Sequence, residues 1–237
     1  MCLKKVKISL GSKKFELPLI EGTLGHKGMD TSILNKEHIF SYDPGFTSTA
    51  ACKSAITYVD GEKGELLYRG YPIEQLAKKC DFLDVSYLLF NGELPNSKEK
   101  EVYSSNINGQ SLLHDQLNNV FRGFRRDAHP MAVMVGVVGS MAAFYFDNMN
   151  INNRNHRKVS ANRLLAKVPT IAAWSHTYNL GLPFVYPKHD LSYVANILNM
   201  MFSSPNKPYH INPVLIRAFE RILILHADHE QNASTST

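Results

Sequence analysis

The hydrophobic pattern of this chain changes its period once, near Pro72, and this change limits the folds that the chain can adopt. Before that point, apolar residues such as Val6 and Ile8 alternate with polar ones, which is typical of a half-buried strand. After it, apolar residues recur every three or four positions, as on one face of a helix. Strands and helices do not alternate along the chain, so the βαβ units of a dinucleotide-binding fold are not expected.

Two β-hairpins are predicted in residues 1–70. The first joins the alternating residues of 6–10 to those of 15–19, and the second joins 55–59 to 65–69. In both cases the intervening residues are rich in glycine and charged side chains, which favour a turn. We therefore expect a β-rich N-terminal region.

The remainder, residues 71–237, is predicted to form a helical domain, which makes the chain mainly α. Asn96 and Glu99 have the spacing of a capping box at a helix start. Asp190 is expected to cap a later helix, because a carboxylate can accept the first free backbone N–H groups. Asn212 and the proline after it are expected to begin the last helix.

Two of the predicted helices have unusual compositions. Residues 131–146 are nearly all apolar, so this helix is expected to be buried on most of its sides. Residues 159–178 contain Pro169, which should bend the helix because proline lacks a backbone N–H. The single tryptophan, Trp174, lies in the same helix and is expected in the core or at a subunit interface.

No feature of the sequence indicates export or membrane insertion. Cys2, Cys52 and Cys80 are too few and too scattered for a disulfide framework or a paired-cysteine zinc site. The residues after Met1 lack the apolar core of a secretory signal. The stretch 131–146 is shorter than the about 20 residues of a membrane-spanning helix. We expect a cytoplasmic protein with no membrane partner.

The formal net charge of +5 raises the question of nucleic-acid binding. The basic residues are spread along the chain and are not interleaved with aromatic residues as in a single-strand binding surface. We therefore favour a solvated surface that also suits anionic metabolites, and expect no nucleic-acid partner. The run Arg122–Asp127 is interpreted as a salt-bridged surface, with an anion-binding patch as the alternative.

The last predicted helix ends in His226 and His229, which are three residues apart and so share one helix face. Three interpretations are open: a metal pair, hydrogen bonding to backbone at the helix end, or binding of a small carboxylate or carbonyl compound. In the last case the amide of Asn232 could help to orient the ligand. A metal pair needs a third protein ligand, and no paired histidine or cysteine offers one, so no metal site is expected.

The same terminal segment resembles the oxaloacetate-binding segment of bacterial citrate synthases, and six further segments agree with that family in order and spacing. The seven segments are Tyr42–Ala50, Tyr68–Ile73, Asn91–Pro95, Ala128–Met131, Phe184–Pro187, Asn199–Phe202 and Leu225–Thr237. Several co-linear motifs are far more specific than any one of them. The chain therefore resembles the N-terminal portion of a bacterial (type II) citrate synthase, with an incomplete large helical domain.

The resemblance implies an acyltransferase of the tricarboxylic acid cycle. The family condenses acetyl-coenzyme A with oxaloacetate and hydrolyses the product to citrate and coenzyme A, without a metal or redox cofactor. Its chemistry combines general acid–base catalysis with charge stabilisation, for which histidine is suited. His229 matches the oxaloacetate-binding histidine of the family, and His226 and Asn232 match neighbouring substrate contacts. A homo-oligomer, either dimer or hexamer, is expected.

The main catalytic residues of the family match segments that would follow Thr237, as does the small domain. The resemblance thus implies no catalytic residue within this chain, and residues 1–237 alone are expected to be inactive. Two alternatives remain open. One is a 2-methylcitrate synthase, which uses propionyl-coenzyme A, and the other is a truncated chain that acts as a non-catalytic interaction subunit.

One bacterial branch of the family is inhibited by NADH, and Tyr145, Arg163 and Lys167 match allosteric positions of that branch. However, Gly109–Leu112 replaces an Arg-His-Thr-Met run of the branch, and Asn206 replaces a cysteine. The first change removes two charged donors that would meet phosphates. The alternative interpretation places Arg163 and Lys167 on a solvated helix face and Tyr145 in the core.

Overall fold

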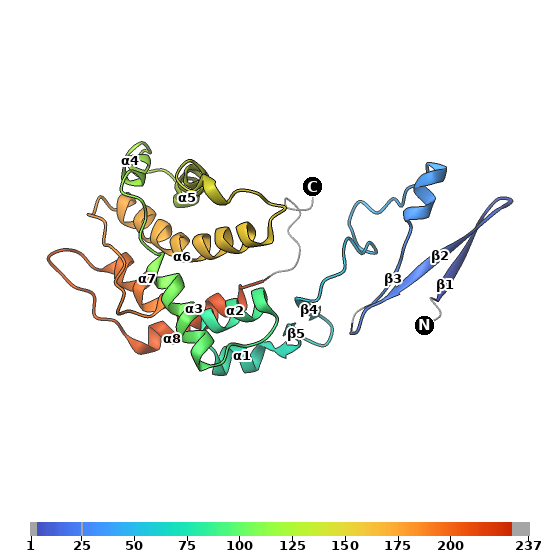
Figure 1. The fold of residues 1–237 in the computed structure, drawn as a ribbon, viewed down its shortest axis with the longest axis horizontal. Helices are drawn as coiled ribbons and strands as arrows, with labels where there is room; N and C mark the ends of the chain where they lie inside the picture. Colours follow the sequence, from blue (N-terminus) through green and yellow to red (C-terminus); the bar gives the residue numbers. More distant parts are fainter. Residues whose placement is uncertain (1–3, 25, 229–237) are drawn as a thin grey trace. The chain divides into compact units, whose positions relative to one another are not determined.

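The computed structural model describes residues 4–24 and 26–228, and it divides the chain after Pro72 into two compact units (Figure 1). Residues 1–72 carry two small antiparallel sheets, and residues 73–237 carry the α-helices. The structure therefore confirms a mainly α chain with β-hairpins near its start.

The first sheet has the strand order β1-β2-β3. Its strands are β1 (Lys5–Leu10), β2 (Lys13–Glu21) and β3 (Lys27–Met29), and a 3-10 helix, η1 (Ser32–Glu37), follows. Leu10 pairs with Lys13, which leaves a two-residue turn in which Gly11 has a φ of +60°. Glycine suits this turn because a side chain disfavours positive φ. The first predicted hairpin is confirmed, and Leu17 of β2 is fully buried.

The second sheet has the order β4-β5-β6 and confirms the second predicted hairpin. Its strands are β4 (Thr57–Asp60), β5 (Glu65–Tyr68) and β6 (Tyr71–Pro72). The strands β5 and β6 are joined by Arg69 and Gly70, whose φ angles are +51° and +87°. Two successive residues with positive φ are the conformation of a tight hairpin turn.

The helical unit begins directly after the second sheet. Its helices are α1 (Ile73–Lys79), α2 (Phe82–Asn91), α3 (Ser97–Gly109), α4 (Leu117–Arg122), α5 (Pro130–Ser140), α6 (Arg154–Asn179), α7 (Tyr193–Phe202) and α8 (Pro213–Leu225), with two 3-10 turns, η2 (Met141–Ala143) and η3 (Phe146–Asn148). Helix α6 runs through the middle of this unit and contacts α3, α5 and α7 (Figure 1). It therefore provides the surface on which α3, α5 and α7 pack.

Of the predicted helix caps, that of α3 is confirmed and that of α7 is not. Asn96 and Glu99 form the predicted capping box at the start of α3, with both reciprocal hydrogen bonds present. The predicted cap of α7 was wrong, because Ser192 and not Asp190 caps it. The Ser192 hydroxyl accepts from the Ala195 N–H, three residues on, whereas Asp190 lies in the preceding turn.

The apolar helix predicted over residues 131–146 is shorter and more exposed than expected. Helix α5 ends at Ser140, and the two 3-10 turns follow it. Only Val133 and Val137 of α5 are buried, whereas Val135 is 71% exposed. The helix packs one face against α4 and α6, and its other sides are exposed although they are apolar. The expectation of burial on most sides was therefore wrong.

The largest hydrophobic cluster surrounds Trp174 of α6, which is fully buried. Its indole stacks on Phe184 with the ring centres 4.5 Å apart, and Phe121 and Tyr186 pack edge-on against it. The indole N–H donates to the Val185 carbonyl at 2.9 Å, so the one polar atom of the side chain is satisfied. This confirms a core position for the tryptophan.

Helix α6 continues without interruption through Pro169. Because proline has no N–H, the carbonyl of Leu165 loses its usual partner within the helix. The Tyr193 hydroxyl, at the start of α7, donates to that carbonyl at 2.8 Å. A side chain of the neighbouring helix thus replaces the hydrogen bond that Pro169 removes and joins α6 to α7.

This arrangement gives a testable expectation for Tyr193. Replacing Tyr193 with phenylalanine should lower the free energy of unfolding by about 1–2 kcal/mol, because the Leu165 carbonyl is left without a partner. The ring packing on Phe82, with ring centres 5.4 Å apart, should persist. Denaturant unfolding of the variant and the parent measures the difference. Equal midpoints and slopes would contradict this role of the hydroxyl.

Candidate functional site

Helix α8 carries the first residue of the predicted substrate site at its C-terminal end. Asn212 caps its start by accepting from the Val214 N–H at 2.8 Å, and Pro213 is the first helical residue. Leu225 is the last helical residue, and His226 follows as the C-cap with an exposed side chain. His226 therefore stands where the helix ends, with its side chain open to solvent.

The ring of His226 is oriented by its own helix. Its Nδ1 lies 2.7 Å from the Ile222 carbonyl oxygen, which can only accept a hydrogen bond. Nδ1 therefore carries the proton, and Nε2 is the nitrogen left for a ligand. In the neutral ring Nε2 accepts a hydrogen bond, and in the protonated ring it donates one. A protonated ring would thus offer a donor and a positive charge to an anionic oxygen.

The other two residues predicted for this site, His229 and Asn232, lie outside the described residues. The described part of the chain also contains no group of three or more His, Cys, Asp or Glu side chains arranged to hold a metal ion. Among the described residues, no helix is both long and apolar enough to cross a membrane.

The three residues matched to allosteric positions lie together in the helical unit. The Arg163 guanidinium carbon lies 4.4 Å from the centre of the Tyr145 ring, and the Lys167 ammonium lies 5.2 Å from it. Arg163 also donates to the Tyr145 carbonyl at 3.3 Å. One aromatic ring therefore interacts with two cations that lie one turn apart on α6.

The alternative interpretation placed Lys167 on a solvated helix face. This is wrong, because only 6% of the Lys167 surface is exposed. Its ammonium donates to the Gln110 carbonyl at 2.7 Å and also to the Leu112 carbonyl. Thr170, one turn further, donates to the Ser111 carbonyl at 2.8 Å. Burial, and then the nearby Arg163, lower the pKa of Lys167 to about 8. Two of the three ammonium donors are thus occupied by the backbone of residues 110–112.

The arginines of the run Arg122–Asp127 have different environments. Arg125 pairs with Asp127 through two hydrogen bonds of 3.0 and 2.7 Å, which agrees with the predicted salt-bridged surface. Arg122 and Arg126 instead line a cavity of about 600 Å³ together with Tyr178 and Phe184. Sequence reasoning missed this cavity, because its walls come from two segments far apart in the chain.

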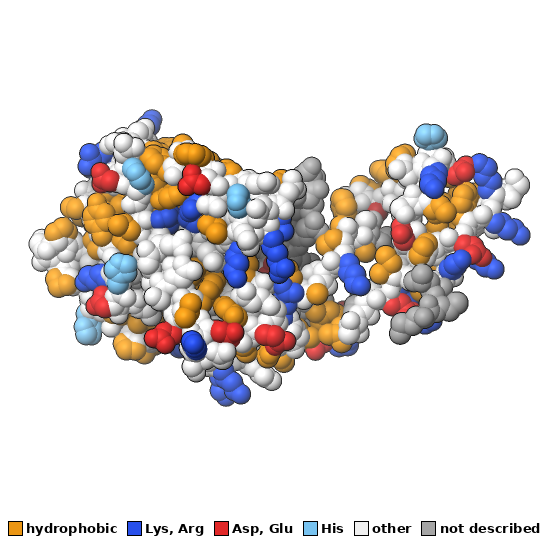
Figure 2. Space-filling model, viewed as in Figure 1, with side chains coloured by type: hydrophobic (Ala, Val, Ile, Leu, Met, Phe, Trp, Pro, Cys, Tyr) orange, Lys and Arg blue, Asp and Glu red, His pale blue; other side chains and the backbone are white. Residues whose placement is uncertain are grey.

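Outside the run Arg122–Asp127, the surface of the helical unit carries both basic and acidic side chains. On the face drawn in Figure 2, some basic side chains of this unit lie among acidic and hydrophobic ones, and several others lie next to one another.

The motif Tyr42–Ala50 has a local role in the first unit. The carboxylate of Asp43 accepts from the Ser48 N–H and the Thr49 hydroxyl, both at 2.8 Å, and from Thr47 at slightly longer distances. These bonds, led by that of the Ser48 N–H, lower the pKa of Asp43 to about 2. The hydroxyl-rich sequence therefore closes a loop around one carboxylate.

Comparison with known proteins shows which family the chain matches. The family model of the citrate synthase C-terminal domain matches residues 45–237, which include α8 and its histidine end. The chain is also similar to the solved citrate synthase of Pyrobaculum aerophilum, with 31% sequence identity and a TM-score of 0.72. That similarity covers 98% of this chain and 53% of the other.

Two further solved citrate synthases are similar. The citrate synthase of Thermotoga maritima has 28% identity and a TM-score of 0.68, and the similarity covers 82% of this chain and 49% of the other. The citrate synthase of Thermoplasma acidophilum, solved as a ternary complex with carboxymethyl coenzyme A and oxaloacetate, has 25% identity and a TM-score of 0.73. That similarity covers 83% of this chain and 50% of the other. The chain thus spans about half the length of these three proteins.

Proposed function

The chain belongs to the citrate synthase family, and on that premise we propose that it supplies the oxaloacetate-binding side of an enzyme that condenses acetyl-coenzyme A with oxaloacetate. The observation that carries the proposal is the family match, which runs through α8 to its histidine-bearing end. The enzyme would act in the tricarboxylic acid cycle, in the cytoplasm and as a homo-oligomer. It would require no metal or redox cofactor.

In this proposal, the end of α8 binds the keto acid. Oxaloacetate carries two carboxylates and one ketone oxygen, all of which accept hydrogen bonds. Protonated His226, with Nδ1 held by the Ile222 carbonyl, would direct an Nε2–H donor at one of these oxygens. His229 and Asn232 would add a second imidazole and an amide. Donors aimed at the ketone oxygen stabilise the negative charge that develops there when the new carbon–carbon bond forms.

The chemical step itself requires groups that the resemblance places in later segments. A carboxylate takes a proton from the acetyl methyl group, and the resulting enolate attacks the ketone carbon of oxaloacetate. Water then cleaves the thioester and releases coenzyme A. We therefore expect residues 1–237, expressed alone, to release no thiol above a blank from the two substrates, in contrast to the intact protein.

The role of His226 can be tested in the intact protein by thiol release from acetyl-coenzyme A and oxaloacetate. His226→Ala should raise the KM for oxaloacetate about tenfold, which corresponds to the loss of one charge-assisted hydrogen bond. His210→Ala, which removes another exposed histidine of the same unit, is the matched control and should leave this KM unchanged. An unchanged KM in His226→Ala would refute the proposed contact. Faster turnover of propionyl-coenzyme A would instead assign the 2-methylcitrate reaction.

We propose a structural role for the cluster of Tyr145, Arg163 and Lys167 in this chain. The support is that Lys167 is buried and bonded to the backbone of residues 110–112, where the sequence lacks the charged donors of the NADH-inhibited branch. Inhibition of the intact enzyme by micromolar NADH, abolished in Lys167→Met, would instead support a nucleotide site at this cluster.

A further inference from the structure

The corner between α1 and α2 brings two opposite helix ends together. Helix α1 ends at Lys79 and α2 begins at Phe82, and only Cys80 and Asp81 separate them. The last carbonyls of α1 and the first N–H groups of α2 have no partners within their own helices. The α1 end therefore carries partial negative charge and the α2 end partial positive charge. Helix α8 packs against both helices.

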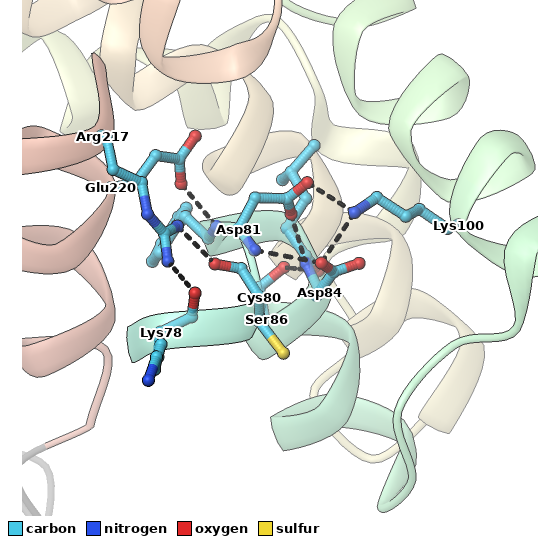
Figure 3. A network of polar contacts seen from close by, with 10 residues as sticks. Lys78, Cys80, Asp81, Asp84, Ser86, Lys100, Arg217 and Glu220 are labelled. Atoms are coloured by element: carbon cyan, nitrogen blue, oxygen red, sulfur yellow. Dashed lines mark hydrogen bonds and ion pairs between the residues drawn. The ribbon is translucent and has the colours of Figure 1, made fainter. Parts of the chain in front are cut away.

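Arg217 of α8 binds the α1 end (Figure 3). Its Nη1 donates to the Cys80 carbonyl at 2.8 Å. Its Nη2 donates to the carbonyls of Ala77 and Lys78, both at 2.6 Å. One guanidinium thus caps three carbonyls at a helix end that favours a cation.

Glu220, one turn further along α8, binds the α2 end (Figure 3). The Phe82 N–H donates to its Oε2 at 2.5 Å. The N-cap residue Asp81 accepts the Asp84 N–H at 2.9 Å, so Glu220 serves an amide that this cap bond does not. Glu220 is buried, with 6% of its surface exposed. Each charge of the pair on α8 therefore meets the helix end of opposite sign.

The surroundings of Glu220 determine which substitution is conservative. Asp81 and Asp84 lie near it, and both form ion pairs of 2.7 Å with Lys100 of α3. Burial raises the pKa of Glu220 to about 7, while its bond from the Phe82 N–H opposes the rise and Asp81 adds to it. A neutral side chain that still accepts a hydrogen bond from the Phe82 N–H should therefore preserve the contact. Glutamine provides such an acceptor.

We propose that Arg217 and Glu220 are positioning residues, which fix α8 against the α1–α2 corner and thereby set where the helix presents His226 to oxaloacetate. This inference rests on the proposed function. His226 lies six positions after Glu220, a rise of about 9 Å along a helix axis. The intervening residues include no glycine or proline that could absorb a displacement. A small shift at the corner is therefore transmitted to the end of α8, where substrate geometry is sensitive to about 1 Å.

The test uses the intact protein and separates the KM for oxaloacetate from that for acetyl-coenzyme A. Arg217→Met and Glu220→Ala should each raise the KM for oxaloacetate about tenfold and leave the KM for acetyl-coenzyme A within about twofold. Glu220→Gln retains an acceptor for the Phe82 N–H, so it should restore the KM for oxaloacetate to near the parent value. This rescue also provides a well-folded variant if Glu220→Ala does not fold.

Thr170→Val is the matched control for lost stability. It removes a buried side-chain hydrogen bond of 2.8 Å to the Ser111 carbonyl, on α6, and should lower the melting temperature without changing either KM. A wild-type KM for oxaloacetate in both Arg217→Met and Glu220→Ala would overturn the positioning role. So would an equal rise in Thr170→Val.

The outcome also distinguishes this inference from the proposed function. If the parent turns over oxaloacetate and His226→Ala raises its KM, while the α8 variants do not, only the positioning role fails. If the parent shows no turnover of oxaloacetate, the proposed function fails, and the positioning role fails with it.

Discussion

Replacing Trp174 with alanine is expected to lower the free energy of unfolding by about 4 kcal/mol, the largest effect of any change considered for this chain. Large-to-small substitutions at fully buried aromatic positions remove both transfer free energy and packing. Here the change removes a stacked contact with Phe184 and two edge-on contacts, with Phe121 and Tyr186. It also leaves the Val185 carbonyl without its donor.

Far-UV circular dichroism during denaturant unfolding is the appropriate measurement for Trp174→Ala, because the variant contains no tryptophan. Trp174→Phe is the control: it keeps an aromatic ring against Phe184 and loses the N–H donor, so its loss should be smaller. A loss below about 1 kcal/mol in Trp174→Ala would show that the surrounding helices collapse readily into the vacated space.

Replacing Lys167 with methionine is expected to lower the free energy of unfolding by about 2 kcal/mol at pH 7. The unbranched methionine side chain resembles the lysine stem, so packing changes little, but the carbonyls of Gln110 and Leu112 lose their shared donor. Relief of the buried charge offsets part of this loss. A variant more stable than the parent would mean that the desolvation of the ammonium outweighs its two hydrogen bonds.

The pH dependence of the same pair of proteins gives an independent check. Lys167 has a pKa of about 8 in the folded chain and an ordinary value of 10.5, so the unfolded chain binds more protons between these values. The free energy of unfolding contributed by Lys167 therefore rises with pH from about 8 to 10.5. The stability difference between parent and Lys167→Met should widen between pH 7 and pH 10, and a constant difference would contradict a buried ammonium.

Local sequence patterns predicted the elements that depend on neighbouring residues. Both hairpins follow from alternation and turn residues, and the capping box of Asn96 and Glu99 needs only a spacing of three. The cap of α7 was missed because Ser192 lies only two residues after Asp190, and the backbone decides which of the two side chains faces the free N–H groups.

Features that depend on distant segments could not be read from the sequence in the same way. An all-apolar composition suggested burial around α5, but burial requires neighbours, and α4 and α6 cover only one face of it. The contacts of Arg217 and Glu220 cross more than a hundred residues of chain, so no local pattern indicates them. His226 was singled out by its place at the end of the last predicted helix, and the resemblance then favoured a substrate contact. The structure adds the carbonyl that fixes its tautomer.

The buried indole has a practical consequence for experiments on this chain. The only tryptophan lies in residues 73–237, stacked on one phenylalanine and shielded from water, so its emission should be blue-shifted and should report that unit alone. The strand-bearing residues 1–72 contribute tyrosine and circular dichroism signals but no tryptophan fluorescence. Following both signals through one denaturant titration would reveal whether the two units melt together or in separate steps.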